Sequence, residues 1–157
     1  MNPQPATAAR VTTIRPRQVP QPLDGRRLLA RGLGIVGLRG IAVVHLAELP
    51  GTWREAPGLG AMFAVVVLAA AITAAAFLHT DRTRIWQVAA LVALAPIGGY
   101  LLTRSVAVPF DRSDVGNWLE PSALVAVFIE VSVVALCTYT LRRSAGEVTD
   151  GLLRRPR

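Results

Sequence analysis

Residues 28–49 read LLARGLGIVGLRGIAVVHLAEL, an apolar stretch that carries an arginine, Arg39, near its middle. Three further apolar runs follow, over residues 59–78, 85–103 and 119–141. A helix needs about 20 mostly apolar residues to cross a bilayer, and each run has about that length. The sequence therefore predicts an all-α integral membrane protein, in which residues 28–143 form a bundle of four transmembrane helices.

The composition of the whole chain agrees with a membrane protein. Hydrophobic residues make up 52% of the 157 residues and charged residues 17%, whereas soluble domains carry about 25% charged residues. Four such helices in so short a chain cannot all be buried in one soluble core. Residues 1–27 are basic and rich in proline, and we expect a disordered tail there. Residues 144–157 are expected to form a second basic tail.

The basic residues indicate how the bundle is oriented. All 17 are arginines, and 13 of them fall within residues 1–31, 80–84 and 142–157, which share one side of a four-helix bundle. Loops rich in arginine stay in the cytoplasm, so both termini are expected there. The abundance of alanine, valine and leucine without lysine is typical of a GC-rich bacterial genome, which predicts the bacterial plasma membrane. This topology explains the net charge of +7 without a nucleic-acid partner.

Two charges fall where a bilayer tolerates them least. Arg39 lies about ten residues into the first apolar run, and Glu130 about eleven residues into the last. With a rise of about 1.5 Å per residue, both lie near the midplane, where a charge costs at least about 2.5–3.5 kcal/mol. We therefore predict an Arg39–Glu130 ion pair between the first and fourth helices. It would either fix the register of the helices or serve as an ion relay or ligand site.

A second polar group is expected on the outer side. His45 and Glu48 are three residues apart, so they share one face of the first helix. Three external acids could approach them: Asp111, Asp114 and Glu120. A histidine with carboxylates suits either a divalent metal or a hydrogen-bonded structural cluster. His79 lies about 25 Å away in depth, which argues against a haem held by both histidines.

Small residues and prolines predict details of the helices. A stripe of glycines follows one side of the first helix: Gly34, Gly37 and Gly40. Such stripes let membrane helices approach closely. Pro50-Gly51 is expected to end the first helix. Pro96, followed by Gly98-Gly99, predicts a kink in the third, because proline removes a helical hydrogen bond.

No sequence motif names a reaction. The chain has no phosphate-binding loop, no Gly-x-Ser-x-Gly elbow and no His-Glu-x-x-His, which favours a role other than enzymatic catalysis. Our leading hypothesis is an accessory or assembly subunit that contacts the lipid bilayer and other membrane subunits or further copies of itself. One alternative is a small homo-oligomeric transporter or channel that uses Arg39 and Glu130. Another is a metal or haem redox protein that uses His45. The sequence identifies no cofactor or ligand.

Overall fold

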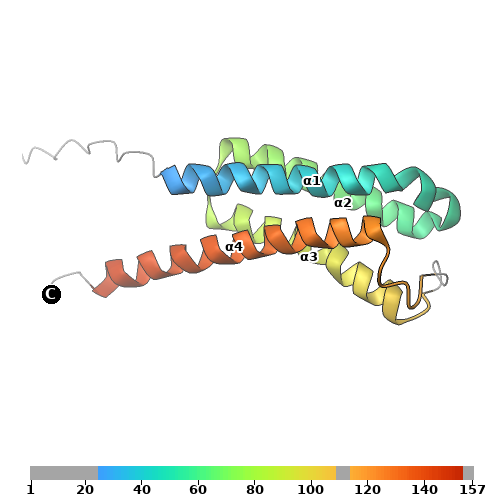
Figure 1. Ribbon diagram of the computed structural model, residues 1–157. Helices are drawn as coiled ribbons and strands as arrows, with labels where there is room; N and C mark the ends of the chain where they lie inside the picture. Colours follow the sequence, from blue (N-terminus) through green and yellow to red (C-terminus); the bar gives the residue numbers. More distant parts are fainter. Residues whose placement is uncertain (1–24, 109–113, 154–157) are drawn as a thin grey trace, which may run out of the picture.

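The computed structural model describes residues 25–108 and 114–153, and these residues are almost entirely helical. Figure 1 shows the helices in chain order: α1 (Gly25–Glu55), α2 (Pro57–His79), α3 (Thr83–Ser105) and α4 (Pro121–Leu153). Within the described residues, four helices are long and apolar enough to span a membrane. The predicted all-helical fold with four such helices is therefore confirmed.

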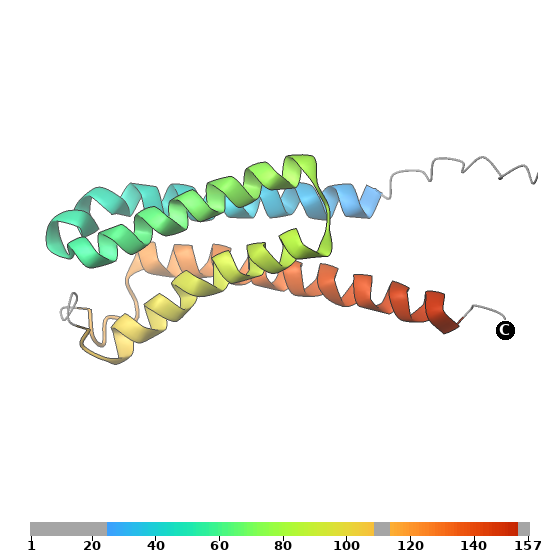
Figure 2. The same ribbon diagram turned by 180° about the vertical axis from the view of Figure 1, so that it is seen from behind.

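The helices run alternately in opposite directions along one bundle. We call one end the termini end, because α1 begins and α4 ends there, beside the turn between α2 and α3 (Figures 1 and 2). The opposite end, which holds the α1–α2 corner and the α3–α4 connection, is called the loop end. At the loop end, α3 leans away from α4 (Figures 1 and 2). The bundle is therefore tighter in its termini half than in its loop half.

The closely packed core lies in the termini half. Its centre is formed by Leu38, Phe77, Trp86, Val133 and Cys137, with small side chains between them. The rings of Phe77 and Trp86 meet edge to face, with centroids 4.7 Å apart, which is a favourable aromatic geometry. The indole Nε1 of Trp86 donates a hydrogen bond of 2.8 Å to Asp81 in the α2–α3 turn. The core thus closes the bundle toward its termini end.

The predicted glycine stripe is confirmed as a packing surface. A Cβ on Gly34 would lie 3.5 Å from the Trp86 ring, and one on Gly40 would lie 3.2 Å from Ile129. A Cβ on Gly37 would collide with a methyl group of Val133. Glycine at these positions lets α1 approach its neighbours closely.

The outward faces of the helices are apolar. Large hydrophobic side chains that are more than half exposed include Val36, Val43, Leu68, Ile72, Leu91 and Phe128. Soluble monomers rarely expose contiguous apolar surface on this scale. The distribution favours lipid as the surroundings of the bundle.

The prediction that Pro50-Gly51 ends the first helix is wrong. Helix α1 includes Pro50 and continues to Glu55. Proline removes one N–H donor from the helix and crowds the carbonyl four residues earlier, but the helical hydrogen bonds resume after Pro50. The backbone N–H of Ala56 donates to the Thr52 carbonyl at 2.8 Å, and the Thr52 hydroxyl donates to the Glu48 carbonyl at 3.0 Å. These bonds hold the last turn of α1 in place.

The last helix is also longer than the apolar run that predicted it. Residues 119–141 form that run, but α4 extends from Pro121 to Leu153. Helical hydrogen bonding does not require apolar side chains, so α4 continues past the predicted span into the polar residues 142–153. Residues 1–24 lie outside the described chain, so the disordered N-terminal tail stays a prediction.

We expect Gly37→Ala to destabilise the bundle by about 1–3 kcal/mol, because its methyl group would overpack against Val133. Adding Val133→Ala should recover part of this loss, so that the two substitutions are less than additive. Unfolding of the purified protein in mixed micelles measures both effects. Gly32→Ala is the matched control, since a Cβ there meets nothing within 4 Å. Equal destabilisation by Gly32→Ala and Gly37→Ala would contradict the close α1–α4 approach.

Candidate functional site

A cavity of about 470 Å³ lies in the loop half of the bundle. All four helices and the α3–α4 connection contribute to its wall. Its polar lining includes His45, Glu48, Arg104, Asp114, Glu120 and Glu130. The rest of the wall is mostly aliphatic and aromatic. The volume falls within the range of about 300–1,000 Å³ that is typical of small-molecule sites.

Small residues on α3 and α4 leave this space open. Gly99 and Ala126 both line the cavity, and a Cβ on Gly99 would meet nothing within 4 Å. Pro96, one turn before Gly99 on α3, lines it as well. Pro96 and Gly99, two of the residues that predicted a kink in the third helix, thus contribute to the cavity wall.

The deepest polar groups of the cavity are His45 on α1 and Glu130 on α4. Their exposed fractions are 5% and 1%. His45 Nε2 lies 3.6 Å from Glu130 Oε1, which is too long for a hydrogen bond. Within the described residues, this Oε1 is buried and has no hydrogen-bond partner. A buried polar atom without a partner is costly, so this carboxylate is suited to receive a donor from the cavity.

The orientation of the His45 ring is fixed by its neighbours. Its Nδ1 lies 3.0 Å from the backbone carbonyl of Ile41. A carbonyl oxygen only accepts hydrogen bonds, so Nδ1 carries the proton. The ring also packs edge to face against Phe63, with centroids 4.9 Å apart. These contacts direct Nε2 toward Glu130.

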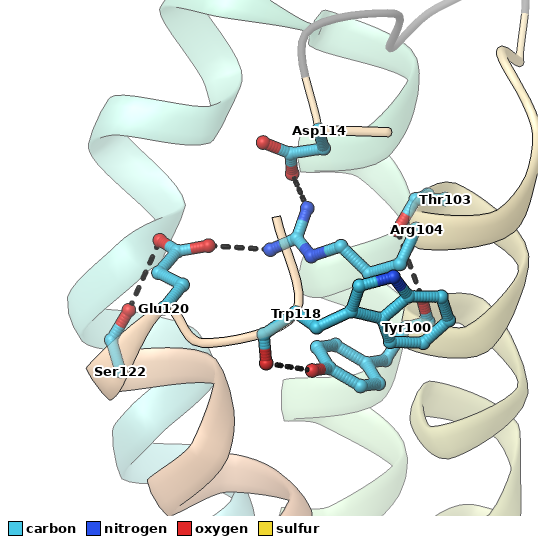
Figure 3. A network of polar contacts seen from close by, with 7 residues as sticks. All are labelled: Tyr100, Thr103, Arg104, Asp114, Trp118, Glu120 and Ser122. Atoms are coloured by element: carbon cyan, nitrogen blue, oxygen red, sulfur yellow. Dashed lines mark hydrogen bonds and ion pairs between the residues drawn. The ribbon is translucent and has the colours of Figure 1, made fainter. Parts of the chain in front are cut away.

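A cluster around Arg104 lies at the loop end of the cavity (Figure 3). Arg104 is 5% exposed, and its guanidinium forms ion pairs with Asp114 and Glu120. Its central carbon also lies 5.4 Å from the centre of the Tyr100 ring, a cation–π distance. One buried cation therefore joins the end of α3 to the connection and to the start of α4.

The backbone around this cluster explains why the connection folds over Arg104. Gly116 has a φ of +83°, a region that glycine adopts without strain. Its N–H donates to the Arg104 carbonyl at 3.0 Å. Tyr100 donates its hydroxyl to the Trp118 carbonyl at 2.7 Å (Figure 3), and the two rings meet edge to face. Asp114 and Trp118, on either side of Gly116, thus both contact residues of α3.

Glu120 directly precedes α4, and its carbonyl accepts the N–H of Leu124 at 3.0 Å. It therefore occupies the N-cap position, where a carboxylate is favoured by the helix dipole. Ser122 donates its hydroxyl to the Glu120 carboxylate at 3.3 Å (Figure 3). The carboxylate thus joins the start of α4 to Arg104.

The structure does not bring Arg39 and Glu130 together. Arg39 is exposed on α1, whereas Glu130 faces His45. Arg39 and His45 are six residues apart, which places their side chains about 120° apart around the helix axis. In the described part of the chain, no ion pair or hydrogen bond joins Arg39 to another residue. Glu130 thus has a histidine rather than an arginine as its neighbour.

The predicted outer-side residues are found along one cavity, but not around a metal. His45 and Glu48 line it together with Asp114 and Glu120, whereas Asp111 lies outside the described residues. Asp114 and Glu120 are paired with Arg104. Across residues 25–108 and 114–153, no group of three or more histidines, cysteines and acids is placed to hold a metal ion.

Arg104 is the functional residue that sequence reasoning missed. No role for this residue was predicted from the sequence. A usable signal was present, because Arg104 directly follows the apolar run of residues 85–103 and precedes a loop rich in acids. A charge at such a position is close enough to the protein interior to form buried pairs.

The arrangement is that of a binding site: an apolar cavity with a few convergent polar groups. Comparisons with models of protein families, with curated protein sequences and with solved structures give no match. The geometry of the cavity is therefore the basis on which a function is inferred.

We expect Arg104→Gln to lower the free energy of unfolding by about 2–4 kcal/mol, because Asp114 and Glu120 would lose the buried cation that pairs with them. Combining it with Glu120→Gln should cost less than the sum of the two single changes. Unfolding in mixed micelles measures these losses. Arg54→Gln, an exposed arginine near the same end, is the matched control and should change stability by less than about 0.5 kcal/mol. If Arg104→Gln behaves like this control, the cluster does not anchor the connection.

Proposed function

We propose that this chain is a multi-pass protein of the bacterial plasma membrane that acts as an accessory subunit and holds a small molecule in its loop-end cavity. The observation that carries this proposal is Glu130, whose buried Oε1 borders the cavity without a hydrogen-bond partner among the described residues. Leaving a carboxylate oxygen in this state is costly. A ligand that donates a hydrogen bond to Oε1 would remove that cost, so the binding of such a ligand in the cavity is favoured.

The orientation we propose places both termini in the cytoplasm. Helices α1 and α4 present their terminal segments at the same end of the bundle (Figure 1). Described arginines are frequent at that end: Arg26, Arg27, Arg31, Arg82, Arg84, Arg142 and Arg143. The positive-inside rule then assigns the loop end, with its cavity, to the outer side of the membrane.

The shape of the bundle favours holding a molecule over conducting one. The cavity extends from the Arg104 cluster to His45 and Glu130. Beyond Glu130, core side chains such as Phe77 and Trp86 fill the termini half. A channel or transporter, our first alternative, would require this tight half to separate. The metal or haem alternative based on His45 stays a prediction.

An engineered cysteine tests the cavity and the orientation together. In a Cys137→Ala background, we expect Ala126→Cys to react with a membrane-impermeant, positively charged methanethiosulfonate added outside intact cells, because Ala126 lines the cavity. Val125→Cys is the matched control, since Val125 lies at the same depth on an exposed face outside the cavity lining. It should react at least about tenfold more slowly, because a charged reagent does not enter hydrocarbon.

Filling the cavity supplies the second arm of this experiment. Gly99→Leu should slow the labelling of Ala126→Cys, whereas Gly98→Leu, whose glycine is exposed and outside the lining, should leave the rate unchanged. Labelling only from the cytoplasmic side would overturn the orientation. Equal rates at positions 125 and 126 would overturn the proposed access to the cavity.

The subunit role itself is supported by a second observation, the exposure of Arg39 on α1. It lies between Val36 and Val43, two exposed apolar residues on the same side of the helix. An arginine facing lipid at mid-span costs at least about 2.5–3.5 kcal/mol. A carboxylate on a transmembrane helix of another subunit would remove most of this cost.

We therefore expect Arg39→Gln to dissociate the protein from its complex. Native gel electrophoresis of gently solubilised membranes should show the wild-type chain in a larger species and the variant at a smaller size. Arg39→Lys should retain the larger species, since it keeps the charge. Arg54→Gln is the control for a lost exposed arginine. A wild-type chain that migrates alone, or an unchanged pattern for Arg39→Gln, would overturn the subunit role.

A further inference from the structure

The hydrogen-bonding roles at the base of the cavity indicate what kind of group would fit there. Because His45 Nδ1 donates to the Ile41 carbonyl, its Nε2 presents a lone pair when the ring is neutral. An ionised Glu130 only accepts hydrogen bonds. Two acceptors therefore face one another across 3.6 Å. A donor with at least two hydrogens, placed beside both atoms, would satisfy Nε2 and Oε1 together.

The charges around the cavity indicate the sign of that donor. Among the described residues, the lining contains four carboxylates, on Glu48, Asp114, Glu120 and Glu130, and one guanidinium, on Arg104. The guanidinium is already paired with Asp114 and Glu120. Low-dielectric walls strengthen the field of the remaining negative charge. The cavity therefore attracts cations and repels anions.

The apolar part of the cavity wall indicates what kind of ligand body would fit. Phe63 lies against the His45 ring, and aliphatic side chains such as Val66 and Val127 continue the lining. This wall offers apolar contact but few hydrogen bonds. An inorganic cation would lose its hydration shell here without replacement. An organic cation with an apolar body fits both the wall and the polar base.

We propose that the cavity binds an organic amine, with its ammonium group between His45 and Glu130 and its apolar body along Phe63 and the aliphatic wall. An ammonium carries two or more N–H donors and a positive charge, which matches the two facing acceptors and the acidic lining. Hydrogen bonds between an ammonium and a carboxylate are among the strongest in proteins. This inference rests on the proposed function, since it names the ligand class of the same cavity.

Three compounds of similar size test the ligand class separately from the existence of the site. We would use 4-phenylbutylamine, 4-phenylbutanol and 4-phenylbutyrate, which each carry a phenyl ring on a short alkyl chain and differ mainly in the charge of the head group. The readout is protection of Ala126→Cys, in the Cys137→Ala background and in lipid nanodiscs, from the neutral reagent N-ethylmaleimide. Val125→Cys, which is outside the cavity lining, corrects for partitioning of each compound into lipid.

The amine should protect at a concentration at least about tenfold lower than the alcohol, because it adds charge-assisted hydrogen bonds. The carboxylate compound should protect least. Glu130→Gln should remove the advantage of the amine and leave protection by the alcohol unchanged. Glu55→Gln, an exposed carboxylate near the same end of the bundle and outside the cavity lining, is the matched control and should preserve that advantage.

The outcomes distinguish the two proposals. If the alcohol protects and the amine is no better, the cavity binds apolar molecules, but the ammonium site is overturned. If no compound protects and Gly99→Leu leaves the labelling rate unchanged, ligand binding in the cavity itself is overturned. If Glu130→Gln does not fold, the order of the three compounds on the parent protein still decides the ligand class.

Discussion

The bundle depends on how closely the inner faces of its helices can approach. In the termini half, glycines of α1 and alanines of α2 and α3 let the helices pack around Phe77 and Trp86. In lipid, helices gain little from hiding apolar surface, because the surrounding hydrocarbon is equally apolar. Close contact between small residues is therefore the main attraction that holds this half together. Where α3 leans away at the loop end, that attraction is lost and polar contacts replace it.

Arg104 is the principal replacement. Its ion pairs with Asp114 and Glu120 connect the end of α3 to the start of α4, and its carbonyl binds the backbone of Gly116. These contacts join α3 to the described part of the connection, residues 114–120, beside the cavity. The two halves of the bundle thus have different physical bases: contact between small side chains in one, and charge pairing around one guanidinium in the other. The cavity lies between the part of the bundle held by small side chains and the part held by the Arg104 ion pairs.

The sequence predicted the helices well and their rotation poorly. Length and hydrophobicity determine which residues cross a bilayer, so the four predicted runs correspond to the four observed helices. Depth was also informative, since it placed Glu130 deep within the fourth helix. Depth alone, however, cannot select a partner. His45 lies on the face of α1 that carries Leu38 and Ile41, and Arg39 lies on another. Applying the helical period of about 100° per residue to this buried face would have favoured His45 as the neighbour of Glu130.

The corrected pairing separates two roles that the predicted ion pair combined. An Arg39–Glu130 pair would have neutralised both charges inside the bundle, and neither charge would then require a further partner. In the structure, Arg39 points out of the bundle and Glu130 points into it. In a membrane, each charge carries a cost that a different neighbour could offset: a group outside the chain for Arg39, and a molecule within the cavity for Glu130. The proposed subunit, which holds a ligand inside and contacts a partner outside, would meet both costs.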